Sequence, residues 1–299
     1  MEKIGEKIRS LRNTKRMTQS ELAGDQITRN MLSLIENGSA LPSLQTIMYI
    51  SERLGVPAGI FLARDGEEII YRKMTELDKI KKTYQKGEYK LCASMCEILL
   101  KDEQDDEVSF MLAKSYLEIG REAFNLGRLH QSCEALDLAC NASERTIYGG
   151  EAIRSVASSY FAYMMRLSPT LTSDYGYDEY SGELSVTDSF CRYSKAVAAI
   201  EDGDGTLALL YLSETPDDSS CYAEHINALL EMLRGEYVSA SDRLVKLINR
   251  SDVECRTIMY EIFSNLETCY REIGNYKGAY EYSVGKIELL QHMLSQTNL

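Results

Sequence analysis

The sequence predicts an all-α protein: a five-helix head followed by a right-handed α-solenoid of helical hairpins. Three observations support this fold class. The 299 residues include only 4 Pro, apolar residues recur at helical spacing, and a glycine-containing turn pattern repeats from Gly87 onwards. With 44% hydrophobic residues the chain has enough apolar material for a sizeable core, so a largely disordered protein is not expected.

The first 64 residues divide into five predicted helices, of which the second and third are short and joined by a tight turn. The second helix has the sequence signature of a capping box, Thr18 with Glu21 three positions later. Thr28 is the expected N-cap of the third helix. Two short helices in this order, held by three others, follow the helix-turn-helix plan. The five helices are expected to start at Ile4, Thr18, Thr28, Leu44 and Ala58.

Four spaced motifs in this head resemble those of the Xre/Cro-type repressor family. The step from Ala23 to Glu36 is one residue shorter than in most Cro-like domains, which is similar to the peptide-pheromone-responsive Rgg, PlcR and PrgX group of Gram-positive bacteria. The resemblance implies double-stranded DNA as a partner and an internal ion pair between Arg12 and Glu36. The motifs are Thr18-Gln19-x-x-Leu22-Ala23, Leu32-Ser33-x-Ile35-Glu36-Asn37-Gly38, Pro42-Ser43-Leu44 and Leu54-Gly55-Val56-Pro57.

The resemblance places the start of the third helix in the DNA major groove, where Arg29 suits guanine and Asn30 suits adenine. Gln19 matches a family residue that binds a phosphate, beside a helix N-terminus whose N–H groups favour the same anion. The alternative is that Arg29 and Asn30 are exposed without a binding role. The expected DNA-contacting residues are Lys15, Thr18, Gln19, Thr28, Arg29, Asn30, Ser33 and Leu34.

A repeat organises the rest of the chain, because four glycine-containing turns each separate two amphipathic runs. The gap between Gly127 and Gly235 leaves room for two or three further units, and residues 265–279 closely follow the tetratricopeptide pattern. The turns are Gly87-Glu88-Tyr89, Gly127-Arg128-Leu129, Gly235-Glu236-Tyr237 and Gly274-Asn275-Tyr276. We therefore expect a helix-turn-helix domain over 1–64, a linker and start of a connecting helix over 65–75, and a tetratricopeptide-like repeat domain over 76–299, for ligand binding and dimerisation.

In such a solenoid the first helix of each hairpin lines the concave side. Asn265 occupies the position where tetratricopeptide domains use an Asn amide to bind a peptide backbone, because an amide both donates and accepts hydrogen bonds. The alternative is that the residues on this side only pack between repeats. Aligning two units by their glycines makes Tyr222, His225, Leu229, Met232, Ser264, Asn265, Thr268 and Arg271 the candidate peptide-binding residues.

Charge and composition narrow the possible functions. Residues 1–64 carry 9 Lys+Arg against 6 Asp+Glu, whereas the whole chain has a net charge of −13. An acidic chain does not suit general coating of nucleic acid or membranes, but its basic head fits DNA binding.

The 8 cysteines have no zinc-ligand spacing, so we expect buried structural thiols, no metal and no cofactor. Since no signal peptide or long apolar run occurs, a cytoplasmic protein without a membrane partner is expected.

The leading hypothesis is a cytoplasmic transcription regulator that binds an inverted-repeat operator as a homodimer. The resemblance implies that its repeat domain senses a short signalling peptide, as in quorum sensing, and so alters operator binding. The alternative is a repeat domain that serves protein–protein interaction or dimerisation without a peptide ligand. A weaker alternative is an interaction scaffold with a vestigial head. No Walker loop, nucleophile elbow or HExxH motif points to an enzyme, so none is expected.

Overall fold

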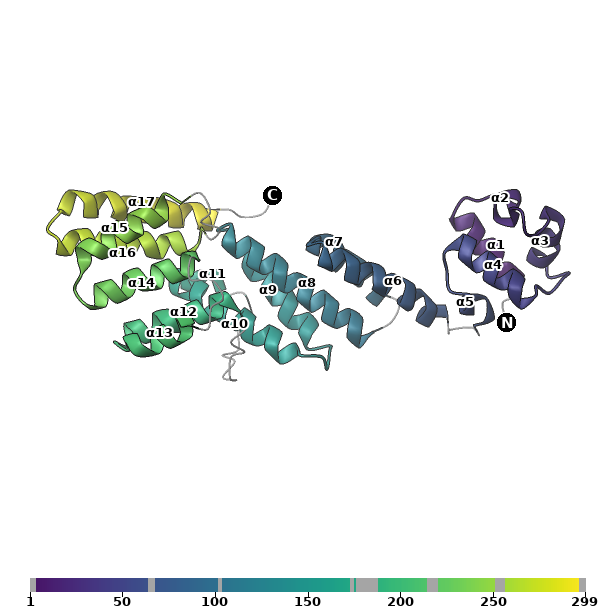
Figure 1. Cartoon of the computed structure of the whole chain (residues 1–299), viewed down its shortest axis with the longest axis horizontal. Coiled ribbons are helices and arrows are strands. Elements are labelled where there is room, and N and C mark those ends of the chain that lie inside the picture. The colour runs from purple at the N-terminus through teal and green to yellow at the C-terminus, as the bar shows by residue number, and fades with distance from the viewer. Residues whose placement is uncertain are drawn as a thin grey trace. The chain divides into compact units, whose positions relative to one another are not determined.

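The computed structural model describes residues 4–63, 68–101, 104–172, 175, 188–213, 220–250 and 256–295, and the regular secondary structure of these residues is helical. The predicted all-α fold class is therefore confirmed. The chain divides into two compact units, Met1–Lys86 and Gly87–Leu299 (Figure 1). In this division residues 76–86 fall in the first unit, and the domain bounds expected from the sequence stay a prediction.

The first unit begins with the five short helices of the head. Hydroxyl side chains cap the second and third of them: Thr18 accepts a hydrogen bond from the N–H of Glu21 and completes a capping box, and Thr28 accepts one from the N–H of Met31. Both predicted caps are confirmed. The helices are α1 (Ile4–Thr14), α2 (Gln19–Ala23), α3 (Arg29–Glu36), α4 (Leu44–Leu54), α5 (Gly59–Leu62) and, after the head, α6 (Glu68–Gln85).

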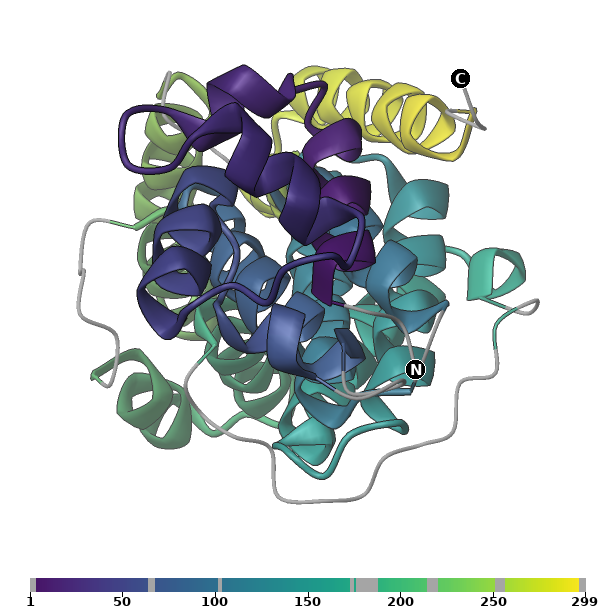
Figure 2. The ribbon, with the colours of Figure 1, turned by 90° about the vertical axis from the view of Figure 1, so that its right-hand side faces the viewer.

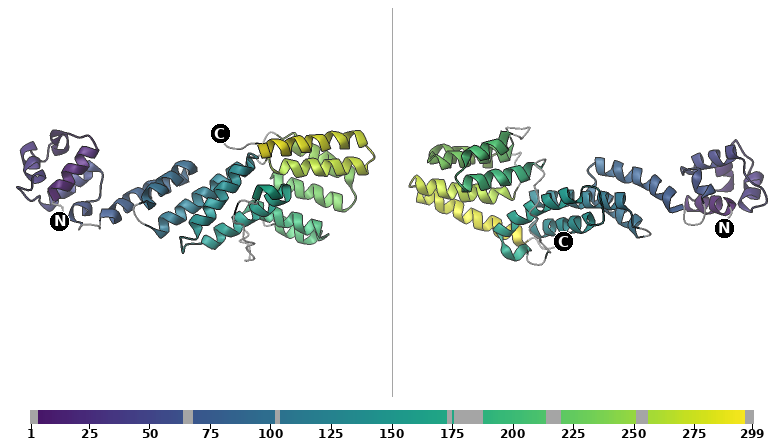
Figure 3. Two further views of the ribbon diagram at one scale, coloured as in Figure 1. Left: turned by 180° about the vertical axis from the view of Figure 1, so that it is seen from behind. Right: turned by 90° about the horizontal axis from the view of Figure 1, so that it is seen from below.

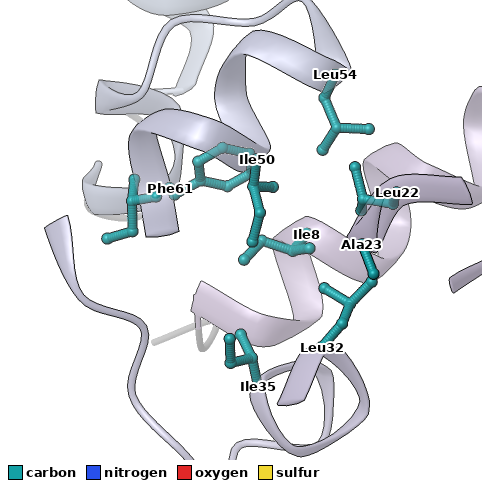
Figure 4. Close-up of a cluster of buried hydrophobic side chains, with 9 residues drawn as sticks. Ile8, Leu22, Ala23, Leu32, Ile35, Ile50, Leu54 and Phe61 are labelled. Atoms are coloured by element: carbon teal, nitrogen blue, oxygen red, sulfur yellow. The ribbon is translucent and has the colours of Figure 1, made fainter. Parts of the chain in front are cut away.

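One apolar cluster holds the head together, with side chains from each of its five helices pointing to a common centre (Figure 4). Close backbone packing assists it: a Cβ built on Gly5 would lie 1.9 Å from the carbonyl oxygen of Ile35, so only glycine lets α1 approach α3 this closely. The buried members are Ile8, Leu22, Ala23, Leu32, Ile35, Ile47, Ile50, Leu54 and Phe61.

A buried ion pair crosses this core, as the resemblance implied. Arg12 of α1 donates two hydrogen bonds to the carboxylate of Glu36 on α3, with N···O distances of 2.7 and 3.0 Å. It donates a third to the carbonyl of Met17, while Gln19 of α2 donates to Glu36 at 2.8 Å. The network therefore ties the two short helices to α1 with every bond charge-assisted.

Burial of Glu36 opposes its ionisation, but the hydrogen bonds from Arg12 and Gln19 outweigh that effect and lower the pKa of the carboxyl below its usual range. A depressed pKa in the folded head means that the ionised carboxylate stabilises the fold. This contribution is complete above the ordinary pKa of the unfolded chain and is lost as the pH falls through the folded value.

The second unit is built of antiparallel helical hairpins, seen from three further directions in Figures 2 and 3. The first helix of each successive hairpin packs against the next, so that α10, α12, α14 and α16 form one wall of the unit. Its helices are α7 (Tyr89–Leu100), α8 (Asp106–Asn125), α9 (Leu129–Ser143), α10 (Gly150–Leu167), α11 (Pro169–Thr172), α12 (Ser189–Glu201), α13 (Gly205–Ser213), α14 (Cys221–Leu233), α15 (Tyr237–Ile248), α16 (Ile258–Glu272) and α17 (Tyr276–Ser295).

The hairpin turns share one geometry. At the α14–α15 turn the N–H of Gly235 bonds to the carbonyl of Met232 and the N–H of Glu236 to that of Glu231, which is a Schellman motif. It requires a positive φ, +81° at Gly235, which glycine adopts without steric cost. The same pair of bonds recurs at Gly127, Gly203 and Gly274, and Gly203 marks one of the further units expected between the turns found in the sequence.

Aromatic side chains fill the interior between the first helices. Phe190 of α12 is at the centre, with ring centroids 4.8 Å from Phe124 of α8 and 4.3 Å from Tyr160 of α10. Phe190 is fully buried, and its edge-to-face contact with Phe124 adds to the stabilisation from apolar burial. The cluster also includes Tyr163, Tyr193 and Tyr222.

The last hairpin of the unit also contacts a much earlier one. The hydroxyl of Thr257, just before α16, donates to the carbonyl of Phe124 near the end of α8. The N–H of Arg256 donates to the carbonyl of Asn125 at 2.7 Å, and Thr257 is completely buried. These two bonds, which we call the α8–α16 tie, join segments about 130 residues apart in the chain.

The cysteines in the described part of the chain form no disulfide, and most are buried, as expected for structural thiols. Burial raises the pKa of Cys133 to about 12, which makes that thiol unreactive. Cys255 and the linker residues 65–67 lie outside the described residues.

We predict that Glu36→Gln destabilises the head by about 2–3 kcal/mol at neutral pH, since it removes the negative charge and one of the two acceptor oxygens that pair with a buried guanidinium. The difference from wild type should begin to shrink only as the pH falls below the ordinary glutamate pKa of about 4.3, where the unfolded chain takes up a proton, and should continue to shrink down to the lowered folded pKa. Differential scanning calorimetry of the full chain at neutral pH and at a series of acidic pH values tests this. Glu52→Gln, an exposed carboxyl on α4, is the matched control and should change little. Equal stability of wild type and Glu36→Gln at neutral pH would contradict the role given to the ion pair.

Candidate functional site

The first turn of α3 presents polar side chains to solvent. Arg29 and Asn30 are both exposed, and within residues 4–63 neither side chain makes a hydrogen bond or ion pair. The apolar side of α3, with Leu32 and Ile35, is turned into the head core. The helix is therefore anchored by one face and leaves the opposite face free to contact a ligand.

The other predicted DNA-contacting residues surround this face. Thr28 and Thr18 are exposed, and each hydroxyl oxygen accepts its capping bond, which leaves the hydroxyl hydrogen available as a donor. Lys15 is exposed at the end of α1. Leu34 is 48% exposed on α3, and Ser33 is half-buried.

The side chain of Gln19, which we expected to bind a phosphate, already makes a contact inside the head. It is half-buried, and one amide N–H is already bonded to Glu36. Because a primary amide has two N–H groups, the second stays available for an anion at the N-terminus of α2. The bond to Glu36 fixes the orientation of the amide, so the network that holds the head together also positions this donor.

The second unit contains a cavity of about 130 Å³ in the wall formed by the first helices of its hairpins. Four helices contribute to it, and its lining combines polar and charged groups with the apolar side chains of Val197, Ile200 and Leu229. The lining residues are Tyr163 and Arg166 from α10, Tyr193, Ser194, Val197, Ile200 and Glu201 from α12, His225 and Leu229 from α14, and Glu261 and Asn265 from α16.

A chain of hydrogen bonds joins three helices at this cavity. The amide nitrogen of Asn265 lies 2.9 Å from Nε2 of His225, and Nδ1 of His225 lies 2.9 Å from the hydroxyl of Tyr193. Since an amide nitrogen only donates, Nε2 accepts and Nδ1 carries the proton. Burial lowers the pKa of His225 to about 4, so the ring is neutral near pH 7. Asn265 is thereby held in one orientation, with its carbonyl oxygen and its second N–H left for another partner.

The structure brings together three of the eight candidate peptide-binding residues, His225, Leu229 and Asn265, around this cavity. Tyr222 instead packs in the aromatic cluster, 4.8 Å from the ring of Tyr193. The other four, Met232, Ser264, Thr268 and Arg271, lie on α14 and α16 outside the cavity lining.

Sequence reasoning did not single out the α10 and α12 side of the cavity. Arg166 and Glu201 form an ion pair at 2.8 Å. Arg166 belongs to a hairpin without a recognisable turn glycine, and Glu201 belongs to one whose distance along the sequence from the other turns is irregular. Their helices could not be aligned with the better-preserved units. Asp188, half-buried and paired with Arg121 of α8, caps the start of α12 by accepting a hydrogen bond from the N–H of Cys191.

Two other hollows lie on the second unit, and each is lined by helices that follow one another in the chain. One of about 470 Å³ is lined by α14 and α15, and one of about 360 Å³ by α7, α8 and α9. Among the described residues no group of His, Cys, Asp and Glu is arranged to hold a metal ion. None of the described helices combines the length and apolar character required to cross a membrane.

Comparison with known proteins gives one family match: residues 8–61 match the helix-turn-helix family model. No curated protein matches the chain. Three solved structures are similar over almost the whole length. They are PlcR from Bacillus thuringiensis in complex with the peptide PapR7 and DNA (18% identity, 99% of this chain and 97% of that chain, TM-score 0.28), ComR from S. thermophilus in complex with DNA and its signalling peptide ComS (17%, 98% and 94%, 0.26), and a mutant of PrgX (13%, 94% and 100%, 0.26).

The family match covers α2 and α3 with their caps and the Arg12–Glu36 ion pair, the features that resemble the Xre type in the sequence. The chain therefore carries an N-terminal helix-turn-helix domain of the Xre type, followed by a unit of helical hairpins.

Proposed function

We propose that this protein is a DNA-binding transcription regulator whose repeat unit binds a short peptide and thereby changes operator binding. The observation that carries the DNA-binding part is the exposed, unpaired first turn of α3 inside a matched helix-turn-helix domain. The peptide part is supported by the cavity with its fixed Asn265 amide. A cytoplasmic location, suggested by the cysteine usage, belongs to the same proposal.

Base reading by α3 follows from the donor groups at its start. The guanidinium of Arg29 matches the two major-groove acceptors of guanine, and the amide of Asn30 matches the acceptor and donor of adenine. Lys15, Thr18 and the second N–H of Gln19 supply phosphate contacts, which position the helix without reading sequence. Ser33 and Leu34 face the groove one turn further along.

We predict that Arg29→Ala and Asn30→Ala each weaken operator binding by about 1–3 kcal/mol and relax base preference. Gel shifts on a selected operator and on scrambled DNA measure both effects. Arg9→Ala, which removes a charge from the exposed side of α1, is the charge-matched control and should weaken all sequences slightly and alike. If both α3 variants bind the operator like wild type, α3 is not the reading helix.

Peptide binding would use the main-chain pairing capacity of Asn265. Its free carbonyl oxygen and N–H match the N–H and carbonyl of a peptide unit in any sequence context. The buried His225 holds the amide in place before binding, so less rotational entropy is lost when the peptide arrives. Leu229 adds apolar surface next to this pair. A peptide alters DNA binding only if it prefers one arrangement of the repeats over another.

Asn265→Ala is therefore expected to abolish the effect of the cognate peptide and to leave peptide-free operator affinity nearly unchanged. Operator affinity of wild type and variant is measured with and without peptide fractions from the producing cell's medium. Asn141→Ala, which removes an exposed amide from α9, is the matched control. A full peptide response in Asn265→Ala would exclude Asn265 as a ligand residue.

A homodimer is part of the proposal, since one head reads few base pairs and two heads on an inverted repeat read twice as many. The repeat unit offers a face for a second copy along α17. Tyr276, Tyr280 and Ile287 recur at helical spacing there and are 72%, 70% and 52% exposed. This face is apolar but has no covering element among the described residues, and α17 lies along one edge of the unit in Figure 1.

We predict that the full chain sediments as a dimer and that Tyr280→Asp shifts it to monomers, because a charge at the centre of an apolar contact is strongly unfavourable. Sedimentation velocity over a range of concentrations measures this. Lys277→Asp changes charge on the neighbouring, solvent-facing side of α17 and should leave the dimer intact. A dimer that survives Tyr280→Asp unchanged would place the interface elsewhere.

The same exposed α17 face favours a second candidate function: a regulator whose repeat unit serves dimerisation or a protein partner and takes no peptide. The two functions differ in one measurement. If no peptide from the medium alters operator affinity of the wild-type protein, the second candidate replaces the first.

A further inference from the structure

The cavity lined by α10, α12, α14 and α16 contains more acidic than basic side chains. Two carboxylates, Glu201 and Glu261, face one guanidinium, that of Arg166. Arg166 is bonded to Glu201 at 2.8 Å, and this pair is about half-exposed at the mouth of the cavity. Glu261 has no ion-pair partner within 4 Å among the described residues. The cavity therefore holds one carboxylate whose charge is not locally balanced.

Burial of Glu261 raises the pKa of its carboxyl, and the nearby Glu201 adds to that effect. Arg166 and Lys286 act in the opposite direction, as does the hydroxyl of Tyr163 beside the carboxyl. Arg166 is already paired with Glu201, and Lys286 is paired with Glu267 at 2.5 Å. Since a partly buried carboxylate without a counter-ion is unfavourable, a cation entering the cavity would gain from meeting it.

The other polar atoms in the cavity complete a set of acceptors. The carbonyl oxygen of Asn265 is left over once its amide nitrogen bonds to His225, and the hydroxyl of Ser194 lines the same space. An ammonium has three donors and no acceptor, so it matches these two oxygens together with Glu261. A volume of about 130 Å³ suits one side chain or one chain terminus and is too small for a whole peptide.

We propose that this cavity binds a primary ammonium group of the peptide, either its N-terminal amine or a lysine side chain, with Glu261 as the counter-ion. This assignment rests on the proposed peptide-binding function and names the chemical class that the site selects. Leu229 and Val197 surround the methylene groups next to the ammonium.

The test is an affinity selection on the full-length protein with synthetic heptapeptides randomised at every position. The library is made in four pools: free ends, N-acetylated, C-amidated, and N-acetylated without lysine. We expect binders in the pool with free ends and in the C-amidated pool, and a loss of about tenfold or more in affinity for the acetylated, lysine-free pool. Comparing the N-acetylated pool with and without lysine separates the two sources of the ammonium.

The variant Glu261→Gln keeps the size of the side chain and removes its charge. We expect it to bind free and acetylated, lysine-free peptides equally well, while Glu272→Gln, an exposed carboxyl on the same helix, keeps the wild-type preference. Circular dichroism shows whether both variants are folded. For wild type, affinity for ammonium peptides should fall as Glu261 becomes protonated in acid, and this fall should be absent in Glu261→Gln.

The outcomes are distinguishable. Binders without any ammonium preference, or a preference that persists in Glu261→Gln, overturn the assignment of Glu261 and leave peptide binding intact. A preference that depends on the free C-terminus instead assigns the cavity to a carboxylate at Arg166 and also overturns it. Absence of binders from all four pools overturns the proposed peptide function itself and this assignment with it.

Discussion

The arrangement of the repeat unit depends on one backbone constraint, the residue with positive φ that directly follows the first helix of a hairpin. At Gly235 and Gly274 this conformation ends α14 and α16 after a fixed number of turns and sends the chain back antiparallel. Because the hairpins turn alike, their first helices stack along one wall. His225 and Asn265, 40 residues apart, meet at 2.9 Å as a result.

In the head, side-chain contacts rather than a repeated backbone turn determine how the helices are arranged. Its short helices bury too little apolar area to fix their positions by packing alone. The charged hydrogen-bond network inside the core therefore also sets their positions. Glu36 takes hydrogen bonds from α1 and α2 while sitting at the end of α3, so the carboxylate determines how far the exposed start of α3 stands from the N-terminus of α2. The spacing between the groups proposed to read bases and the groups proposed to bind phosphate is thus set by a buried ion pair.

Local features of the fold were predictable from the sequence because they depend on neighbours within a few residues. The caps at Thr18 and Thr28 and the turns at Gly127, Gly235 and Gly274 are of this kind. The Arg12–Glu36 pair came from the family resemblance. The cavity was only partly predictable, since Arg166 and Glu201 reach it through the packing of α10 and α12, whose irregular spacing hides the repeat. Tyr222 has the spacing of a wall residue, but its ring packs better in the aromatic cluster than beside Asn265.

The α8–α16 tie changes what kind of array this unit is. In an open row of repeats each hairpin contacts only its neighbours, so repeats can be gained or lost and can unfold one after another. Here the bonds from Arg256 and Thr257 to the end of α8 close the row into a loop. Adding or removing one hairpin inside that loop would move α16 away from its acceptors, which fixes the number of hairpins between them. The enclosed hairpins should also unfold together, as a single cooperative block with the folding kinetics of a high-contact-order domain.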